Sequence, residues 1–465
     1  MLFNSAPFLV FLLATLAFTY AVPRRWRSGV LLGASLLFYF MWIPKYLLLL
    51  LADLAGNHLL MRAMVRSRNP RRFLVAALVL GLGVLGYFKY AAFFVDSARP
   101  LLAALGLGTI QPPHILLPLG ISFFTFQMLA LSIDVYRGRI EPPRSFREHL
   151  LFISFFPQLI AGPIVRGWEL LPQLRAGGQP TAERWRRGLW LIGAGLFKKV
   201  LLADLFLAPF VDRVFETPGW GGGARHLLAI YSFAFQIYFD FSGYTDMARG
   251  MALLFGFELP LNFLEPYLSR NPTELWRRWH VTLSHWLRDY LYIPLGGNRR
   301  GPARTYVNLL LTMLLGGLWH GAAWTFVIWG GLHGLLLALH RALGRPLDAE
   351  RGLHWRDAPA ILLTFHAVCF LWIFFRADTL HDALAVIRAL AVGPYVGWAW
   401  LQVGVLALCA LLHGLERWAR LHAAELRAWL GGVPGGLVEG AAFGALAALV
   451  VLFGGNGGEF IYFQF

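Results

Sequence analysis

His320 is the residue whose type and setting most strongly suggest chemistry. It lies in LLGGLWHGAAW (314–324), between two predicted membrane spans. Imidazole titrates near about pH 6.5, so His320 can act as a general base at neutral pH. Trp319 and Trp324 can form the walls of a slot, and three glycines allow backbone or a ligand to approach closely: Gly316, Gly317 and Gly321. An ionisable side chain at membrane depth suggests a functional site, but the residues alone favour a structural hydrogen bond over catalysis.

His280 is the second candidate, in TELWRRWHVTLSHWLRDYLYIPLGGNRR (273–300). It follows Arg277 and Arg278, whose guanidinium groups can bind either the phosphates of an anionic substrate or lipid headgroups. The apolar and aromatic residues of Glu274–Tyr292 recur every three to four positions, which predicts an amphipathic interfacial helix.

Two aspartates and two cysteines lie within apolar runs. Asp240 and Asp246 are costly there unless they are paired or reach water, so they either orient a base or satisfy local backbone and Arg249. Cys369 and Cys409 are predicted to be packing residues, and the sequence offers neither a disulfide framework nor a metal cluster. The Walker A motif, the Gly-x-Ser-x-Gly elbow and His-Glu-x-x-His are also missing from the sequence, and no dinucleotide-binding glycine fingerprint occurs in a strand–helix context. A histidine-based reaction without a protein nucleophile is therefore the most economical enzymatic interpretation.

The composition indicates what must position these residues. The 465 residues are 58% hydrophobic and 14% charged, with a mean hydropathy of +0.58. Soluble domains carry about a quarter charged residues, so disorder and a soluble enzyme are excluded. We predict an all-α, polytopic integral membrane protein with one domain over residues 1–465. About 11–12 transmembrane helices are expected, at 4–22, 29–43, 46–65, 73–95, 114–134, 188–211, 226–257, 305–319, 322–340, 358–376, 396–414 and 434–454.

Two regions cannot be ordinary spans. Residues 149–168 are interrupted by prolines and glycine, and residues 262–304 are rich in arginine and aromatic residues. Non-helical backbone at membrane depth survives only where protein or a water-filled cavity covers it. We therefore expect re-entrant or interfacial segments in both regions.

Charge gives a predicted orientation. Forty-one Lys and Arg against 25 Asp and Glu leave a net charge of +16, carried mainly by loops. The positive-inside rule explains this excess without nucleic-acid binding. It predicts a bacterial inner (plasma) membrane protein with a periplasmic N-terminus, since RRWR (24–27) follows the first span.

Ten stretches together resemble the membrane-bound O-acyltransferase family, specifically the bacterial branch that contains the membrane subunit of alginate O-acetylation. They follow one order over nearly the whole chain: LGYFKY (85–90), LPLGISFFTFQ (117–127), DVYRG (134–138), FFPQLIAGPIVR (155–166), FKKVLLAD (197–204), YFDFSGYTDMA (238–248), NFLEPY (262–267), ELWRRWHVTLSHWLRDYLYIPLGGNRRG (274–301), LLGGLWHGAAW (314–324) and FIYFQF (460–465).

This resemblance implies helices around a central tunnel, with His320 as the catalytic histidine and His280 as a second histidine near it. We assign substrate binding to Arg277, Arg278, Trp319, Asp289, Asn298 and Arg299. The implied donor is acetyl-coenzyme A or another acyl thioester, with no bound cofactor and no metal. The implied acceptor is an exopolysaccharide, and the implied partner is a periplasmic esterase-like acyltransferase.

Two other functions stay open. D-alanyl transfer to teichoic acid uses a thioester on a carrier protein. A basic cytoplasmic entrance to the tunnel suits both this carrier and free coenzyme A, because both donors carry phosphate. A polysaccharide or lipid transporter is a different class; it would favour internal repeats, and the sequence contains none.

Overall fold

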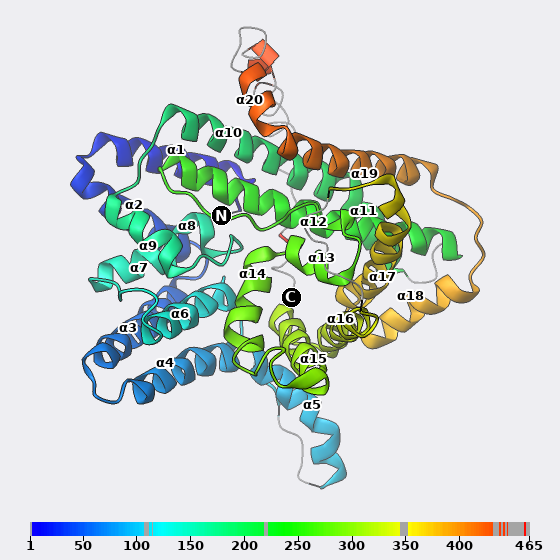
Figure 1. Ribbon diagram of the computed structural model, residues 1–465, viewed down its shortest axis with the longest axis horizontal. Coiled ribbons are helices and arrows are strands. Elements are labelled where there is room, and N and C mark those ends of the chain that lie inside the picture. The colour runs from blue at the N-terminus through cyan, green and yellow to red at the C-terminus, as the bar shows by residue number, and fades with distance from the viewer. Residues whose placement is uncertain are drawn as a thin grey trace. The chain divides into compact units, whose positions relative to one another are not determined.

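The computed structural model describes residues 2–106, 111–113, 115–217, 222–344, 352–430, 437–438, 440–441, 444 and 460–461. Within these ranges the secondary structure is helical, with no strand (Figure 1). The chain divides into two compact units, residues 3–189 with 248–260 and residues 190–247 with 261–465. Each unit is built from two separate stretches of chain, and the single domain over 1–465 stays a prediction.

The first unit begins with helices that follow the predicted spans closely. Ser5 caps the first of them by accepting a hydrogen bond from the Phe8 N–H group, and prolines begin α3 and α4, where a missing N–H group costs nothing. The unit contains α1 Ala6–Ala21, α2 Arg24–Phe40, α3 Pro44–Arg66, α4 Pro70–Leu85, η1 Gly86–Tyr90, α5 Ala91–Ala104, α6 Ile121–Tyr136, α7 Phe146–Ser154, α8 Phe156–Leu159 and α9 Gly167–Ala176. Helix α10 Ala182–Leu196 begins in this unit and ends in the second.

The second unit holds the predicted histidines. Helix α12 Gly222–Leu254 lies in it up to residue 247. Its other elements are η2 Phe197–Leu207, α11 Ala208–Glu216, η3 Pro266–Leu268, α13 Pro272–Arg278, α14 Val281–Leu287, η4 Arg288–Tyr292, α15 Gly301–His320, α16 Trp324–Ala342, η5 Trp355–Asp357, α17 Ala358–Arg376, α18 Leu380–Val392, α19 Trp400–Leu421 and α20 Ala423–Leu430.

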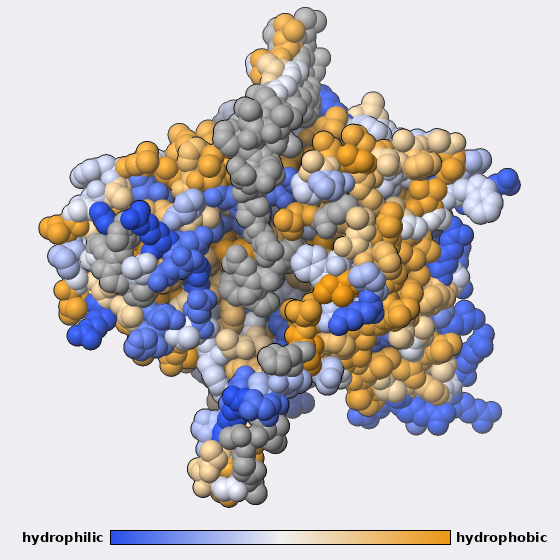
Figure 2. Space-filling model, turned by 180° about the vertical axis from the view of Figure 1, so that it is seen from behind, coloured by the Kyte–Doolittle hydropathy of each residue, from blue (hydrophilic) through white to orange (hydrophobic). Residues whose placement is uncertain are grey.

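The all-α membrane fold is confirmed. Among the described residues, 44–66, 70–104 and 355–376 form helices long and apolar enough to cross a membrane, and 6–21 and 121–136 form shorter apolar helices. Large apolar side chains are exposed along the three long helices, among them Leu48, Leu59, Val79, Leu362 and Leu363. Hydrophobic surface also covers much of the face shown in Figure 2. Most of the span predicted at 434–454 lies outside the described residues.

The interruption predicted in 149–168 is confirmed. Helix α7 ends at Ser154, the short α8 follows, and α9 begins only at Gly167. Every residue from 149 to 167 is buried, as irregular backbone within a membrane protein requires.

One predicted element is wrong. Residues Glu274–Tyr292 do not form a single helix, because α13 ends at Arg278 and α14 begins at Val281. The break is made by pairing with the preceding loop: the Leu264 N–H donates to the Arg278 carbonyl, and the Val281 N–H donates to the Asn262 carbonyl, both at 2.9 Å. The 3.6-residue periodicity continues across the break, which is why the sequence pattern does not reveal it.

The two cysteines are packing residues, as predicted. Cys369 and Cys409 are both free and buried, and both belong to the hydrophobic core of the second unit.

Candidate active site

A close helical hairpin brings His320 into the core of the second unit. Helices α15 and α16 pack along their lengths, and paired glycines allow this approach. A Cβ atom on Gly317 would lie 2.2 Å from the Phe326 carbonyl oxygen, and one on Gly330 would lie 2.2 Å from the Met313 carbonyl oxygen. His320 is the last residue of α15, so its side chain is fixed where the hairpin turns.

Aromatic rings surround His320, which is only 4% exposed. Its imidazole centroid lies 5.0 Å from that of Trp319, 5.1 Å from Trp329 and 5.4 Å from Phe375. The Trp319 ring thus packs beside the His320 ring, whereas Trp324 is 57% exposed. The slot between the two tryptophans stays a prediction.

The structure brings His280 close to the same indole. The ring centroids of His280 and Trp319 are 6.1 Å apart, and His280 is fully buried. Phe241 of α12 also packs on the His280 ring, with the two ring centroids 4.7 Å apart. Two histidines separated by forty residues of sequence thus share one tryptophan neighbour.

A hydrogen-bond network fixes the ring of His280. Its backbone is in the left-handed region, with φ at 42°, a conformation that is strained for a residue with a Cβ. The Thr282 hydroxyl and backbone N–H both donate to Oδ1 of Asn262, and Nδ1 of His280 lies 3.0 Å from that oxygen. An oxygen can only accept, so Nδ1 carries the proton and Nε2 carries the lone pair. Burial lowers the pKa of His280 to about 3, which keeps the imidazole neutral at physiological pH.

Further buried donors lie beside the two histidines. In the described part of the chain, the indole nitrogens of Trp276, Trp279, Trp329 and Trp372 are buried without an acceptor. His333, between Trp276 and Trp329 at 5.0 and 4.6 Å, has no partner there for either ring nitrogen. Buried polar groups normally have a partner, so this cluster is suited to water or to the oxygen atoms of a substrate.

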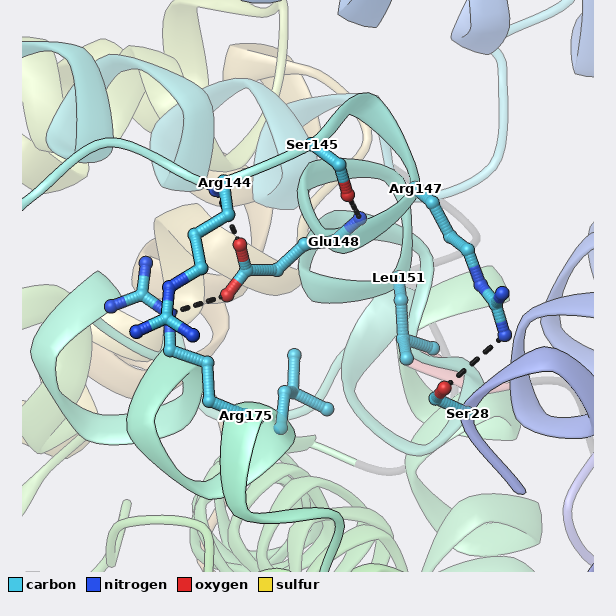
Figure 3. A pocket seen from close by; sticks show the side chains of 8 residues that line it. Ser28, Arg144, Ser145, Arg147, Glu148, Leu151 and Arg175 are labelled. Carbon is cyan, nitrogen blue, oxygen red and sulfur yellow. Dashed lines mark hydrogen bonds and ion pairs between the residues drawn. The ribbon is translucent and has the colours of Figure 1, made fainter. Parts of the chain in front are cut away.

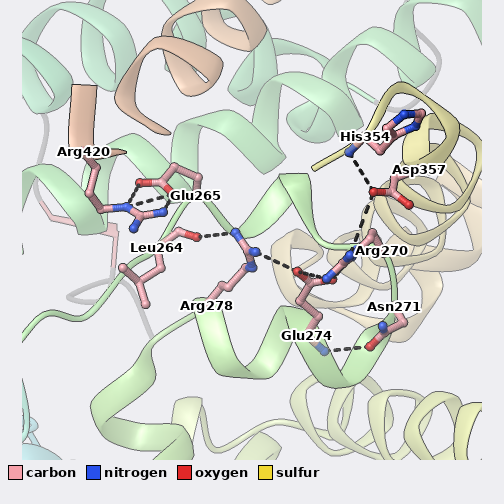
Figure 4. Close-up of polar contacts among 9 residues, drawn as sticks. All are labelled: Leu264, Glu265, Arg270, Asn271, Glu274, Arg278, His354, Asp357 and Arg420. Carbon is pink, nitrogen blue, oxygen red and sulfur yellow. Dashed lines mark hydrogen bonds and ion pairs between the residues drawn. The ribbon is translucent and has the colours of Figure 1, made fainter. Parts of the chain in front are cut away.

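Arg277 and Arg278 differ sharply in their surroundings. Nη2 of Arg278 pairs with Oε1 of Glu274 at 2.7 Å, and Nη1 donates to the Leu264 carbonyl (Figure 4). Glu274 also binds Arg270. Burial alone would raise the pKa of Glu274, but the hydrogen bonds from Arg270 and the charge of Arg278 lower it below its usual value. Arg278 therefore serves the fold in this structure, whereas Arg277 is exposed.

The other predicted substrate residues lie at the surface or near it. Asn298 and Arg299 are exposed, in the turn that precedes α15. The Asp289 carboxylate accepts a hydrogen bond from Nε of Arg288 at 2.7 Å. Their assignment to substrate binding stays a prediction.

The two aspartates of α12 each form an ion pair with a different lysine of η2. Asp240 lies 2.5 Å from Nζ of Lys199 and accepts a hydrogen bond from the Ile461 N–H at 2.8 Å. Asp246 pairs with Lys198 at 2.8 Å, and Lys198 also binds Glu416 of α19. Neither lysine is predicted as a partner from the sequence, although adjacent basic residues in the apolar stretch FKKVLLAD are a usable signal. The described residues contain no group of three His, Cys, Asp or Glu side chains that could hold a metal ion.

Comparison with known proteins decides the family. The family model of the membrane-bound O-acyltransferases matches residues 118–377. The chain belongs to the membrane-bound O-acyltransferase family. The match covers both histidines of the candidate site, and the chain is thus a membrane-integral acyltransferase.

Similar proteins in this family carry informative names. The chain is 43% identical to the probable alginate O-acetylase AlgI of Azotobacter vinelandii, over 84% of this chain and 78% of that protein. It is 39% identical to a peptidoglycan O-acetyltransferase of Helicobacter pylori, over 79% and 73%. A teichoic acid D-alanyltransferase of Bacillus subtilis is more distant, at 28% identity over 58% of this chain and 72% of that protein.

Proposed function

We propose that this acyltransferase moves an acetyl group from a cytoplasmic thioester to the hydroxyl groups of an exopolysaccharide such as alginate. The observation that carries the proposal is the pair of buried imidazoles, His280 and His320, whose ring centroids lie 6.1 and 5.0 Å from that of Trp319. The similarity to proteins named for alginate and peptidoglycan O-acetylation supports acetyl as the acyl group and a glycan as the acceptor.

His320 is the proposed general base. It removes the proton from a hydroxyl group as the hydroxyl oxygen attacks the thioester carbonyl carbon. The C–S bond of the resulting tetrahedral intermediate then breaks, and the imidazolium returns its proton to the leaving thiolate. The new ester forms without a covalent bond to the protein.

His280 has a different proposed role. An imidazole with a pKa of about 3 is a weak base, since a general base works best with a pKa near the operating pH. Its Nε2 lone pair is suited to accepting a hydrogen bond from the attacking hydroxyl group. We assign His280 to orienting the acceptor.

Trp329 is suited to stabilising the charge that develops on the carbonyl oxygen. Its centroid lies 5.1 Å from that of His320, and its Nε1–H is buried with no acceptor in the described chain. A preorganised donor in a dry site lowers the barrier of such a reaction strongly.

The two substrates require access from opposite sides of the membrane. A charged coenzyme cannot cross lipid, whereas exopolysaccharide hydroxyls lie outside the cell. We therefore propose a bacterial inner-membrane location with a periplasmic N-terminus, consistent with the basic loops. A periplasmic esterase-like protein is the proposed partner for a relay of the acetyl group, and in that case the hydroxyl group that attacks at His320 belongs to the relay and not to the polymer itself.

The donor is tested with inverted membrane vesicles that contain the protein, its periplasmic partner and its polysaccharide. Labelled acetyl-coenzyme A is expected to transfer label to the polymer, whereas a D-alanyl thioester on a carrier protein is expected to transfer none. Vesicles without the protein are the control. Transfer from the carrier alone would replace our proposal with teichoic-acid-type D-alanylation, the activity of the more distant Bacillus subtilis relative.

Arg277 and Arg278 are expected to respond differently to mutation. Arg277→Gln should raise KM for the donor about tenfold with little change in kcat, because a lost phosphate contact is worth roughly 1.5 kcal/mol. Arg278→Gln should lower the melting temperature instead, since it leaves Glu274 buried without one of its partners. Steady-state kinetics and thermal unfolding in detergent separate the two effects. An unchanged KM in Arg277→Gln would remove that residue from donor binding.

A further inference from the structure

A basic pocket of about 280 Å³ lies in the first unit, where α7 begins (Figure 3). One water molecule occupies about 30 Å³ in the liquid, so the pocket can hold a group much larger than water. The residues that matter for its chemistry are Ser28, Arg144, Ser145, Arg147, Glu148 and Arg175. None of them belongs to the candidate active site.

The charges of this pocket are unbalanced. Arg175 is already neutralised, because its Nε atom lies 2.6 Å from Oε1 of Glu148 and its Nη1 atom lies 3.9 Å from Glu141. Among the described residues, no acid pairs with the guanidinium group of Arg144 or of Arg147. The lining therefore carries three arginines against one glutamate and has an excess of two positive charges.

One of the two guanidinium groups without an acid partner is held in place. Nη2 of Arg147 donates to Oγ of Ser28 at 3.2 Å. The Arg144 backbone N–H donates to Oε2 of Glu148, and Ser145 caps α7 by accepting from the Glu148 N–H at 3.2 Å. The pocket thus lies at a helix N-terminus, which adds partial positive charge to that of the arginines.

A small crevice adjoins the pocket. It shares Ser28 and Leu174 with the pocket, and its volume of about 10 Å³ is too small for an acyl chain. The pocket therefore offers room for a charged group and not for a lipid tail. Arg144 and Arg147 also belong to a basic stretch that the positive-inside rule assigns to the cytoplasmic side.

We propose that this pocket binds a phosphate group. The planar guanidinium group of arginine can donate two parallel hydrogen bonds to phosphate oxygens. Basic pockets on the cytoplasmic side of membrane proteins bind lipid headgroups. The phosphate can belong to an anionic phospholipid or to a soluble ligand such as coenzyme A.

Binding to the purified full-length chain tests this proposal. Native mass spectrometry measures retention of phosphatidylglycerol against phosphatidylcholine, and calorimetry measures the binding of coenzyme A. The double variant Arg144→Gln with Arg147→Gln is expected to weaken binding of the true phosphate ligand at least tenfold. The matched control, Arg68→Gln with Arg71→Gln, removes the same charge from exposed arginines of the same unit and is expected to bind like the wild type.

The outcome identifies the source of the phosphate. Loss of phosphatidylglycerol retention alone indicates a lipid site, and loss of coenzyme A affinity alone indicates a soluble ligand. Arg147→Lys keeps the positive charge but cannot donate two parallel hydrogen bonds to a phosphate, so we expect it to bind with intermediate affinity. Its melting temperature shows whether the variant is folded. If neither ligand binds more weakly to the double variant than to the control, the proposal is wrong.

Discussion

Replacing His320 by alanine is expected to lower the rate of acyl transfer at least about a hundredfold. A positioned general base contributes about 10²–10⁴-fold to such a reaction, and His320 is the buried imidazole at the turn of the glycine-paired hairpin. The measurement is transfer of labelled acetyl from acetyl-coenzyme A to polysaccharide in membrane vesicles, normalised to the amount of protein in the membrane.

The packing around His320 calls for a second variant. His320 contacts the rings of Trp319, Trp329 and Phe375, so alanine removes packing as well as a base. His320→Gln keeps most of the volume and is expected to be as inactive as alanine, with a melting temperature near that of the wild type. His366→Ala removes an exposed imidazole of α17 and is the matched control. Activity within threefold of the wild type in His320→Gln would exclude general-base catalysis by this residue.

The sequence was sufficient to predict the helical membrane fold and the setting of His320. Long apolar runs leave little alternative to helices in lipid, and glycines at 317 and 330 are needed where two helices touch. The cysteines in apolar runs were likewise interpreted correctly as packing residues.

The break at His280 was not predictable from periodicity. Leu275 and Leu283 are both buried in helices, but the segment between them leaves the helical conformation to pair with the loop that contains Asn262. That loop lies 18 residues earlier in the chain, so the decisive contact is tertiary. A local pattern carries no information about it.

The partners of charged residues are likewise not predictable from the local sequence. Arg277 and Arg278 are adjacent and identical in type, but only Arg278 meets Glu274 one helical turn earlier. Spacing of i to i+4 predicts that such a pair is possible. Only the fold determines that Glu274 is buried and that it therefore requires its arginines.

Asn262 is expected to be a positioning residue for His280. Asn262→Leu removes the oxygen that accepts from Nδ1 of His280 and from Thr282, so the imidazole loses the partner that determines its tautomer. We expect acyl transfer to fall about tenfold to a hundredfold, because an unmet buried donor costs about 1–3 kcal/mol. Thr282→Val is the matched control, since it removes one donor to the same oxygen but leaves the His280 contact, and its effect should be much smaller.

Asn262→Asp distinguishes positioning from a merely structural role. Aspartate keeps an oxygen that can accept from the same donors, so it should restore most of the activity that leucine loses. Its negative charge favours the imidazolium form, which raises the pKa of His280 from about 3. As the pH falls, His280 should therefore become protonated at a higher pH than in the wild type, and acyl transfer, which needs the neutral ring, should decline earlier on the acidic side. The pH profile of kcat measures this shift, and an Asn262→Leu enzyme with wild-type activity would show that the orientation of His280 does not matter to the reaction.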